Sequence, residues 1–197
     1  MKVIFFFNNQ RGLSVLNTLA KKKFLIKHIF LSKKNLNKKI FQKICAQKIP
    51  FSKVINVNSK KVESIIKKIK PDLNIVAGFP YIIKKKIYNI PKYGTINLHA
   101  GKLPEYRGGS PLNWQIINNE KKIGISIIKL TQKLDAGKII CSKKFDLKNN
   151  YDINKVHELS NKYFSLLTLN AIQKILKNKK FKKQDVKKAK YWRQRKE

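Results

Sequence analysis

Continuous apolar runs alternate with amphipathic segments through the first half of the chain. A run that is apolar at nearly every position is typical of a strand buried on both faces of a parallel sheet. Residues 3–7 form such a run, and residues 24–31, 54–57, 73–77 and 94–98 are predicted as further strands. Between the first two, apolar residues recur at helical spacing, at Leu13, Leu16 and Leu19. This alternation predicts an α/β fold, a mostly parallel twisted sheet with helices on both faces.

Two further helices are predicted between these strands. Residues 34–47 have the spacing of a polar-faced helix. Ser59 is positioned to cap a helix that continues through Ile69, and Pro71 follows it as a stop signal.

The pattern changes in the second half of the chain. Residues 111–118 are typical of a short helix, and residues 123–130 and 138–145 of two strands. Because the turn Asp135-Ala136-Gly137 joins these strands, we expect an antiparallel extension of the sheet. A long helix should then begin at Asp152 or Asn154. Its predicted apolar stripe consists of Val156, Leu159, Tyr163, Leu166, Leu167, Ile172 and Leu176.

The length of 197 residues fits one folded domain, predicted over residues 1–177. From Lys174 to Glu197 there are 12 basic residues and two acidic ones. Residues 178–197 are therefore predicted to form a solvated basic tail, with Tyr191 and Trp192 as its anchors.

The formal net charge of +36 raises the question of a nucleic-acid-binding surface. Only four of the 46 basic residues are arginine, and the lysines are spread through nearly every segment beside abundant Asn and Ile. Phosphate clamps favour arginine for its bidentate fork. The lysine excess therefore favours the amino-acid drift of an AT-rich genome over a dedicated nucleic-acid surface.

Cysteine and histidine usage excludes two classes of site. Cys45 and Cys141 are too isolated for a disulfide framework, and both are predicted to be small core residues. The three histidines, His28, His99 and His157, have no metal-ligand spacing, so no metal site is expected.

Neither a secretory signal nor an apolar run of about 20 residues is evident, and we expect a cytoplasmic protein without membrane contact.

A candidate catalytic group follows the fifth predicted strand. Asn97 and His99 are two residues apart, so both side chains project from the same face, at the carboxyl end where ligands bind in open sheets. An imidazole can take a proton from an attacking amine, and an amide NH₂ can donate to a developing oxyanion. Asp135 would orient the imidazole and favour its protonated form. The imidazole, the amide and the carboxylate together are the groups needed to transfer an acyl group to an amine.

Each of these residues also has a purely structural interpretation. His99 alone is typical of a buried histidine that bonds a backbone carbonyl, and Asn97 of a residue that bridges a turn. Asp135-Ala136-Gly137 alone is ordinary turn chemistry. Their joint occurrence, in this order, favours the catalytic interpretation.

The motifs Asn97-Leu98-His99, Leu103-Pro104-x-x-Arg107-Gly108 and Leu134-Asp135-Ala136-Gly137 resemble the folate-dependent formyltransferase family. This family includes methionyl-tRNA, glycinamide ribonucleotide and sugar N-formyltransferases. The likeness extends from the first strand to about Asp146. It implies a Rossmann-like formyltransferase domain that uses 10-formyltetrahydrofolate as the formyl donor. It also implies that Asn97, His99 and Asp135 are the catalytic residues.

The resemblance extends to the expected folate site. The segment after the fourth strand is similar to the family's loop at the pterin pocket, and Gly101-Lys102-Leu103-Pro104 matches the loop that closes over the same cofactor. The folate-binding residues implied are Phe79, Pro80, Tyr81, Ile82, Ile83, Asn97, Gly101, Lys102, Leu103, Pro104 and Asp135.

The acceptor is predicted to be the amino group of a nucleotide-linked aminodeoxysugar. Asn8-Asn9-Gln10-Arg11-Gly12 lacks the glycine-rich phosphate loop expected of the purine-pathway enzymes. The C-terminal β-barrel usual in methionyl-tRNA enzymes is not expected here. Pro111-Leu112-Asn113-Trp114 resembles the sugar-modifying branch.

Two alternatives stay open. One is a compact methionyl-tRNA formyltransferase that binds tRNA through the lysine-rich tail, and the other is an inactive basic binding module. The oligomeric state is also open, with a homodimer as one alternative.

Overall fold

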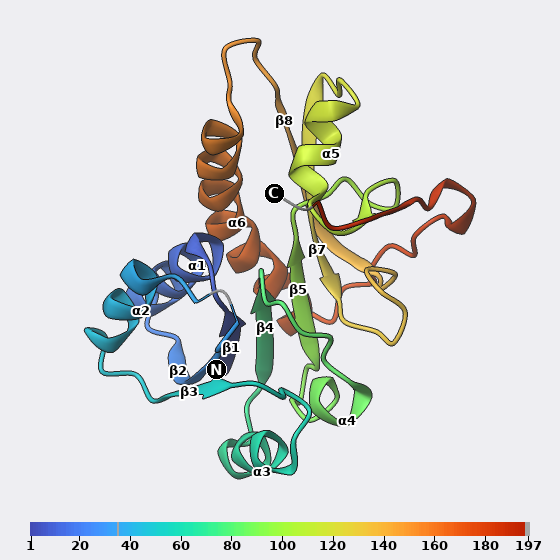
Figure 1. Cartoon of the computed structure of the whole chain (residues 1–197). Helices are drawn as coiled ribbons and strands as arrows, with labels where there is room; N and C mark the ends of the chain where they lie inside the picture. The colour runs from blue at the N-terminus through green and yellow to red at the C-terminus, as the bar shows by residue number, and fades with distance from the viewer. Residues whose placement is uncertain (35, 196–197) are drawn as a thin grey trace. The chain divides into compact units, whose positions relative to one another are not determined.

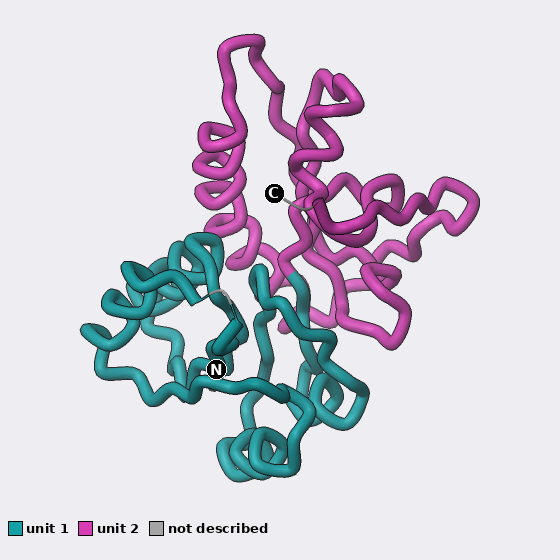
Figure 2. The backbone as a smooth tube through the Cα atoms, viewed as in Figure 1, with its two compact units in different colours: residues 1–97 teal, residues 98–197 magenta. Residues whose placement is uncertain are grey.

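A computed structural model describes residues 1–34 and 36–195 of the chain. These residues form two compact units, 1–97 and 98–197, shown in different colours in Figure 2. The boundary falls within strand β5 (Thr95–His99), whose first three residues belong to the first unit.

The first unit is built on parallel strands (Figure 1). These are β1 (Lys2–Phe7), β2 (Leu25–Ser32), β3 (Phe51–Val54), β4 (Leu73–Ala77) and the start of β5, in the order β3-β2-β1-β4-β5. Residues 3–7 of β1 are all fully buried, which agrees with their unbroken apolar pattern. The predicted parallel sheet is confirmed.

Four helices flank these strands: α1 (Gln10–Lys21), α2 (Lys38–Cys45), α3 (Lys60–Ile69) and α4 (Lys85–Tyr88). In Figure 1, α1 and α2 lie on one side of the strands and α3 and α4 on the other. The first three begin at Asn9, Asn37 and Ser59, whose side chains accept backbone N–H bonds. These caps satisfy donors that the first turn of a helix leaves free.

The second unit contains the remaining elements: β6 (Arg107–Gly108), α5 (Pro111–Ile117), β7 (Lys122–Lys129), β8 (Ile139–Asp146), α6 (Ile153–Leu176), the 3₁₀ turn η1 (Val186–Lys188) and β9 (Tyr191–Trp192). Strands β7 and β8 are antiparallel, and the hydrogen-bonded order continues β5-β7-β8. The predicted antiparallel extension is therefore present. Helix α6 packs against β7 and β8.

Some local predictions were wrong. The third strand lies at Phe51–Val54 instead of 54–57, because it is an edge strand paired with β2 alone and tolerates polar residues. Cys45 is exposed, since Ile40 and Ile44 form the buried face of α2 and the next residue turns away from it. Cys141 is buried as predicted.

The buried face of α6 also differs from the predicted stripe. Leu166 and Leu176 are exposed, whereas Ser160, Phe164 and Thr168 are fully buried. The Ser160 and Thr168 hydroxyls donate to the carbonyls of His157 and Phe164 within the helix, at 2.9 and 2.7 Å. Because the helix itself satisfies these hydroxyls, burial leaves no lost hydrogen bond. The predicted stripe was therefore right for Val156 and Ile172, which are buried, and wrong for Leu166 and Leu176.

The described part of the predicted tail, residues 178–195, is held by backbone hydrogen bonds. Tyr191 and Trp192 form β9, which pairs in parallel with β6, and Lys182 exchanges two backbone bonds with Ile139. Backbone pairing leaves no apolar pattern, which is why composition indicated a solvated segment. The domain limit at residue 177 stays a prediction.

Ile75 tests the core of the first unit. Its side chain is fully buried in β4 between Phe5 and Ile96, whereas Ile55 is 69% exposed. Ile75→Ala should lower the free energy of unfolding by about 2–5 kcal/mol through the lost apolar contacts and the cavity. Ile55→Ala, the matched control, should change it by less than about 0.5 kcal/mol. Urea denaturation measures both, and equal losses would contradict the assigned core.

Candidate active site

The candidate catalytic residues Asn97 and His99 lie at the carboxyl end of β5. Their spacing of two residues along one strand directs both side chains to the same face. Asn97 is half-buried, whereas His99 is 5% exposed. The strand therefore presents a half-buried asparagine and a buried histidine.

His99 has an acceptor at each ring nitrogen. Nε2 lies 2.5 Å from the backbone carbonyl of Tyr106, and Nδ1 lies 3.5 Å from Oδ2 of Asp135. A protonated imidazolium can donate to both acceptors, whereas a neutral ring can donate to one. Each ring nitrogen of His99 therefore faces an oxygen acceptor.

Asp135 is fixed from a second direction. Its Oδ2 accepts a hydrogen bond from the backbone N–H of Gly108, at 2.9 Å. The residue has a φ of 48°, a left-handed conformation that aspartate adopts more readily than most residues. With 7% of its surface exposed, its carboxylate is removed from bulk water and held in place by the backbone of β6.

The segment that follows β5 is packed tightly over the His99 ring. A Cβ atom on Gly101 would lie 2.4 Å from the Tyr106 carbonyl oxygen and 2.6 Å from Nε2 of His99. Position 101 therefore requires glycine for this close approach.

Two polar side chains hold the same segment from other elements. Ser126 on β7 donates its hydroxyl to the Gly101 carbonyl at 2.9 Å. Gln115 on α5 donates to the Ala100 carbonyl at 3.2 Å and also bonds both backbone groups of Gly124. Neither residue could be predicted from the sequence, because single side chains that bond distant backbone groups carry no local signal.

The turn that carries Asp135 is held by Gln184. The Gln184 amide donates to the carbonyls of Asp135 and Gly137, at 2.8 and 2.7 Å. Its oxygen accepts from the Arg107 guanidinium, at 2.7 Å from Nη2 and 3.0 Å from Nε. Arg107 is 3% exposed and also donates to the Tyr191 hydroxyl. Gln184, which lies in the predicted tail and was not predicted as functional, thereby connects β6 to the Asp135 turn, and Arg107 connects β6 to β9.

Tyr106, whose carbonyl faces His99, has its own side chain fixed. Its ring stacks on Trp192 with centroids 5.6 Å apart and an interplanar angle of 10°, and its hydroxyl donates to Glu120 at 2.8 Å. Burial raises the pKa of the Tyr106 phenol above its ordinary value, and the Glu120 carboxylate raises it further. The phenol therefore stays a neutral donor.

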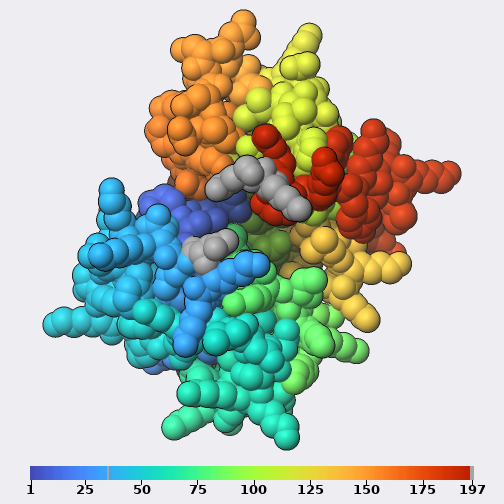
Figure 3. All heavy atoms as spheres, in the orientation of Figure 1, coloured from blue at the N-terminus to red at the C-terminus, as the bar shows by residue number. Residues whose placement is uncertain are grey.

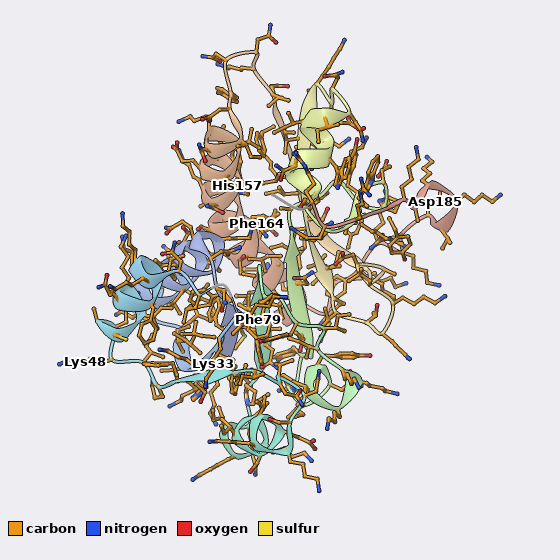
Figure 4. The ribbon with its side chains drawn as sticks, viewed as in Figure 1. Lys33, Lys48, Phe79, His157, Phe164 and Asp185 are labelled. Atoms are coloured by element: carbon orange, nitrogen blue, oxygen red, sulfur yellow. The ribbon has the colours of Figure 1, made fainter. Side chains whose placement is uncertain are left out.

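The predicted folate residues of the first unit form the loop that follows β4. The Phe79 ring, labelled in Figure 4, makes edge contacts with Phe6 and Tyr81, with centroids 5.7 and 5.5 Å apart. Ile83 is buried, whereas Pro80 and Ile82 are exposed. Asn58 holds the loop backbone by bonding the Ile82 carbonyl and the Lys84 N–H. The loop thus combines a fixed backbone with accessible apolar groups.

The predicted folate residues of the second unit differ in exposure. Gly101, Leu103 and Pro104 are buried, and Lys102 is half-buried. The Lys102 ammonium lies 3.8 Å from a Glu105 carboxylate oxygen and 3.6 Å from a Glu120 carboxylate oxygen. Backbone groups and the lysine stem, rather than a free ammonium, are therefore what this segment offers a ligand.

The described residues, 1–34 and 36–195, were searched for a metal-ligating cluster and for a membrane-spanning helix. No group of three or more metal-ligating side chains occurs among them. No helix among them is long and apolar enough to cross a membrane.

Gln184 provides a test of how the site is held. Gln184→Ala should lower the free energy of unfolding by about 1–3 kcal/mol, because two carbonyls and the Arg107 guanidinium lose their partner. The imidazole resonances of His99 should also move as the Asp135 turn loosens. Gln42→Ala, at an exposed position of α2, is the matched control and should change stability by less than about 0.5 kcal/mol. Unchanged His99 resonances in NMR spectra of Gln184→Ala would contradict this role.

Comparison with known proteins identifies the family. A family model described as formyl transferase matches residues 2–165. The methionyl-tRNA formyltransferase of Sulfurihydrogenibium sp. is 36% identical over 135 residues, 68% of this chain and 43% of that protein. The bifunctional polymyxin resistance protein ArnA of Wigglesworthia glossinidia brevipalpis is 36% identical over 186 residues, 91% of this chain and 28% of that protein.

A solved structure supports the same fold. The N-formyltransferase of Helicobacter canadensis, in complex with folinic acid and dTDP-3-aminofucose, aligns with a TM-score of 0.76 and 19% identity, over 98% of this chain and 71% of that chain. The chain spans less than half the length of the two curated relatives. The family match includes Asn97, His99 and Asp135, and Gln184 lies beyond it. Because the match covers most of its length, the chain belongs to the formyl transferase family.

Proposed function

We propose that this protein transfers a formyl group from 10-formyltetrahydrofolate to the primary amine of a nucleotide-linked aminodeoxysugar. The observation that carries the proposal is the buried pair of His99 and Asp135 at the end of β5, with 3.5 Å between Nδ1 and Oδ2. Asp135 is held there by the Gly108 N–H, and Asn97 projects from the same face of β5 as His99. The family match adds formyl transfer as the reaction type.

The roles of the three residues follow from their chemistry. The acceptor amine attacks the formyl carbon, and the Asn97 amide donates to the oxyanion that forms. His99 takes the proton that the amine nitrogen loses, Asp135 stabilises the resulting imidazolium, and the positive charge of that imidazolium stabilises the oxyanion. The bond between the formyl carbon and the folate nitrogen then breaks, and that nitrogen leaves with the proton that His99 returns. No serine or cysteine accompanies His99 as a nucleophile, so we propose direct transfer without a covalent enzyme intermediate.

The segments that the family resemblance implies are proposed to take part in folate binding. They are the loop of residues 79–83, residues 101–104, Asn97 and Asp135. The half-buried Phe79 and Tyr81 support this assignment, because a pterin is flat and aromatic and packs well on aromatic rings. No metal is part of the proposal.

The aminosugar is the acceptor that we favour. The likeness to ArnA extends over 91% of the chain, and a relative by fold was solved with dTDP-3-aminofucose. Methionyl-tRNA is the second candidate, favoured by the 36% identity to a methionyl-tRNA formyltransferase and by the net charge of +36. An inactive basic binding module is the remaining alternative, which formyl transfer to any amine would exclude.

The catalytic roles can be tested by substitution. His99→Ala and Asp135→Ala should each reduce turnover at least about a hundredfold, because proton transfer or its electrostatic support is lost. Binding of 5-formyltetrahydrofolate, measured by calorimetry, should persist. His157→Ala, at an exposed position of α6, should leave the rate unchanged. A near-normal rate in either catalytic variant would remove the proposed roles.

The acceptor can be tested with a panel of amines. Uridine- and thymidine-diphosphate aminosugars should be formylated, at rates that change little between low and moderate salt. Methionyl-tRNA should be a poor substrate. Turnover of tRNA that falls steeply with salt would favour the second candidate instead.

A variant of the basic tail separates the two acceptors further. Deletion of the chain after Leu176 would also remove Gln184, which holds the Asp135 turn. Substitution of individual lysines leaves that turn intact. Lys179, Lys180 and Lys183 are exposed. Replacing all three by glutamine should leave aminosugar turnover unchanged. A selective loss of tRNA turnover in this variant would contradict the aminosugar assignment.

A further inference from the structure

Arginine is rare in this chain, which makes its positions informative. Four of the 46 basic residues are arginine, and two of them, Arg193 and Arg195, line one cavity of about 290 Å³ in the second unit. Trp114 and Gln194 complete its lining. Arg107 is accounted for by its bonds to Gln184 and Tyr191. Arg193 and Arg195 are exposed instead, so fold stability does not account for them.

The aromatic wall of the cavity is held in one position. The Trp114 ring packs on Trp192 with centroids 4.9 Å apart, and Trp192 stacks on Tyr106. Trp114 Nε1 donates to the Arg193 carbonyl at 2.9 Å, and Trp192 Nε1 donates to the Glu105 carbonyl at 3.0 Å. Both indole N–H groups are therefore satisfied by backbone. A flat ligand would meet a rigid indole at little entropic cost.

The backbone that carries the two arginines is fixed as well. The Arg195 N–H donates to the Ser110 hydroxyl at 3.1 Å, and the Gly109 N–H donates to the Trp192 carbonyl at 2.9 Å. A Cβ atom on Gly109 would lie 2.5 Å from Cα of Gln194, so the two segments are in close contact. In Figure 3 the C-terminal segment, in red, lies beside the yellow-green spheres of the α5 region. The cavity is therefore built on paired backbone.

The guanidinium groups are available to a ligand. Within residues 1–34 and 36–195, neither Arg193 nor Arg195 has a side-chain hydrogen bond or ion pair. Elsewhere the chain uses lysine for nearly all its exposed positive charge. Guanidinium differs from ammonium in presenting a planar fork that binds two phosphate oxygens at once. Two such forks beside a fixed indole match a nucleotide, in which an aromatic base is linked to phosphates.

We propose that this cavity binds the nucleoside diphosphate part of the acceptor, with the base against Trp114 and the diphosphate on Arg193 and Arg195. The inference rests on the proposed function and specifies where its acceptor is recognised. The volume of about 290 Å³ is close to the lower limit for small-molecule sites. The arginines lie beyond residues 2–165, the part that the family model matches.

Direct binding, without folate or amine, tests this site. Calorimetry with UDP and dTDP should show binding to the wild-type chain that Arg193→Ala/Arg195→Ala weakens about tenfold to a hundredfold, the effect of losing charge-assisted hydrogen bonds. Arg193→Lys/Arg195→Lys should weaken it as well, since charge is kept and the fork is lost. Lys187→Ala/Lys188→Ala removes the same charge from exposed positions of the same segment, and should change binding less than about twofold.

Substitution of Trp114 tests the site independently of the arginine variants. Trp114→Leu should weaken UDP or dTDP binding by about tenfold through lost stacking. Binding of inorganic pyrophosphate should weaken less, because it is affected only through the lost bond to the Arg193 carbonyl. Circular dichroism confirms that each variant is folded.

Three results would overturn the site. The first is nucleotide binding that Arg193→Ala/Arg195→Ala leaves unchanged. The second is binding that Lys187→Ala/Lys188→Ala weakens equally, which would indicate general attraction of anions. The third is a short single-stranded RNA that binds more tightly than UDP and dTDP, which would indicate an RNA end. If UDP or dTDP binds as proposed but no sugar nucleotide is formylated, the site stands and the proposed function fails.

Discussion

The contact on which the site depends is the carboxylate of Asp135, held between the His99 ring and the Gly108 N–H. Burying a charge is costly unless it is paired and hydrogen-bonded, and both conditions are met here. The left-handed backbone at Asp135 is the conformation that brings its side chain to this position. The buried pair therefore ties the end of β5, the strand β6 and the turn after β7 to one arrangement.

Residues far apart in the sequence support that arrangement. Gln115 and Ser126 hold the segment after β5, and Gln184 holds the turn that carries Asp135. In each case a side chain satisfies backbone groups that would otherwise be left unpaired in a partly buried place. This explains why the C-terminal segment, basic and polar in composition, is a structural part of the second unit. The same segment positions Arg193 and Arg195.

Much of this could be predicted from the sequence. Unbroken apolar runs predicted the parallel strands, because burial on both faces excludes polar residues, and the fully buried residues 3–7 are the clearest case. The order of Asn97, His99 and Asp135 along the chain predicted a shared site, and the structure places the last two in contact. Whether all three catalyse formyl transfer stays a proposal.

Other features left no signal in the sequence. Gln184 acts through side-chain bonds to distant backbone, which no periodicity records. The buried Ser160 and Thr168 of α6 satisfy their hydroxyls within the helix, so hydropathy identified only part of the buried face. Backbone pairing of β6 with β9 was missed because two-residue strands have no pattern.

The central claim is that Asp135 acts through His99 in formyl transfer. A double-mutant cycle of kcat/KM with His99→Ala, Asp135→Ala and the double variant measures this coupling most directly. The account predicts that the double variant is scarcely slower than His99→Ala alone, because the carboxylate has no imidazolium left to stabilise. Losses that multiply, as for independent residues, would contradict it.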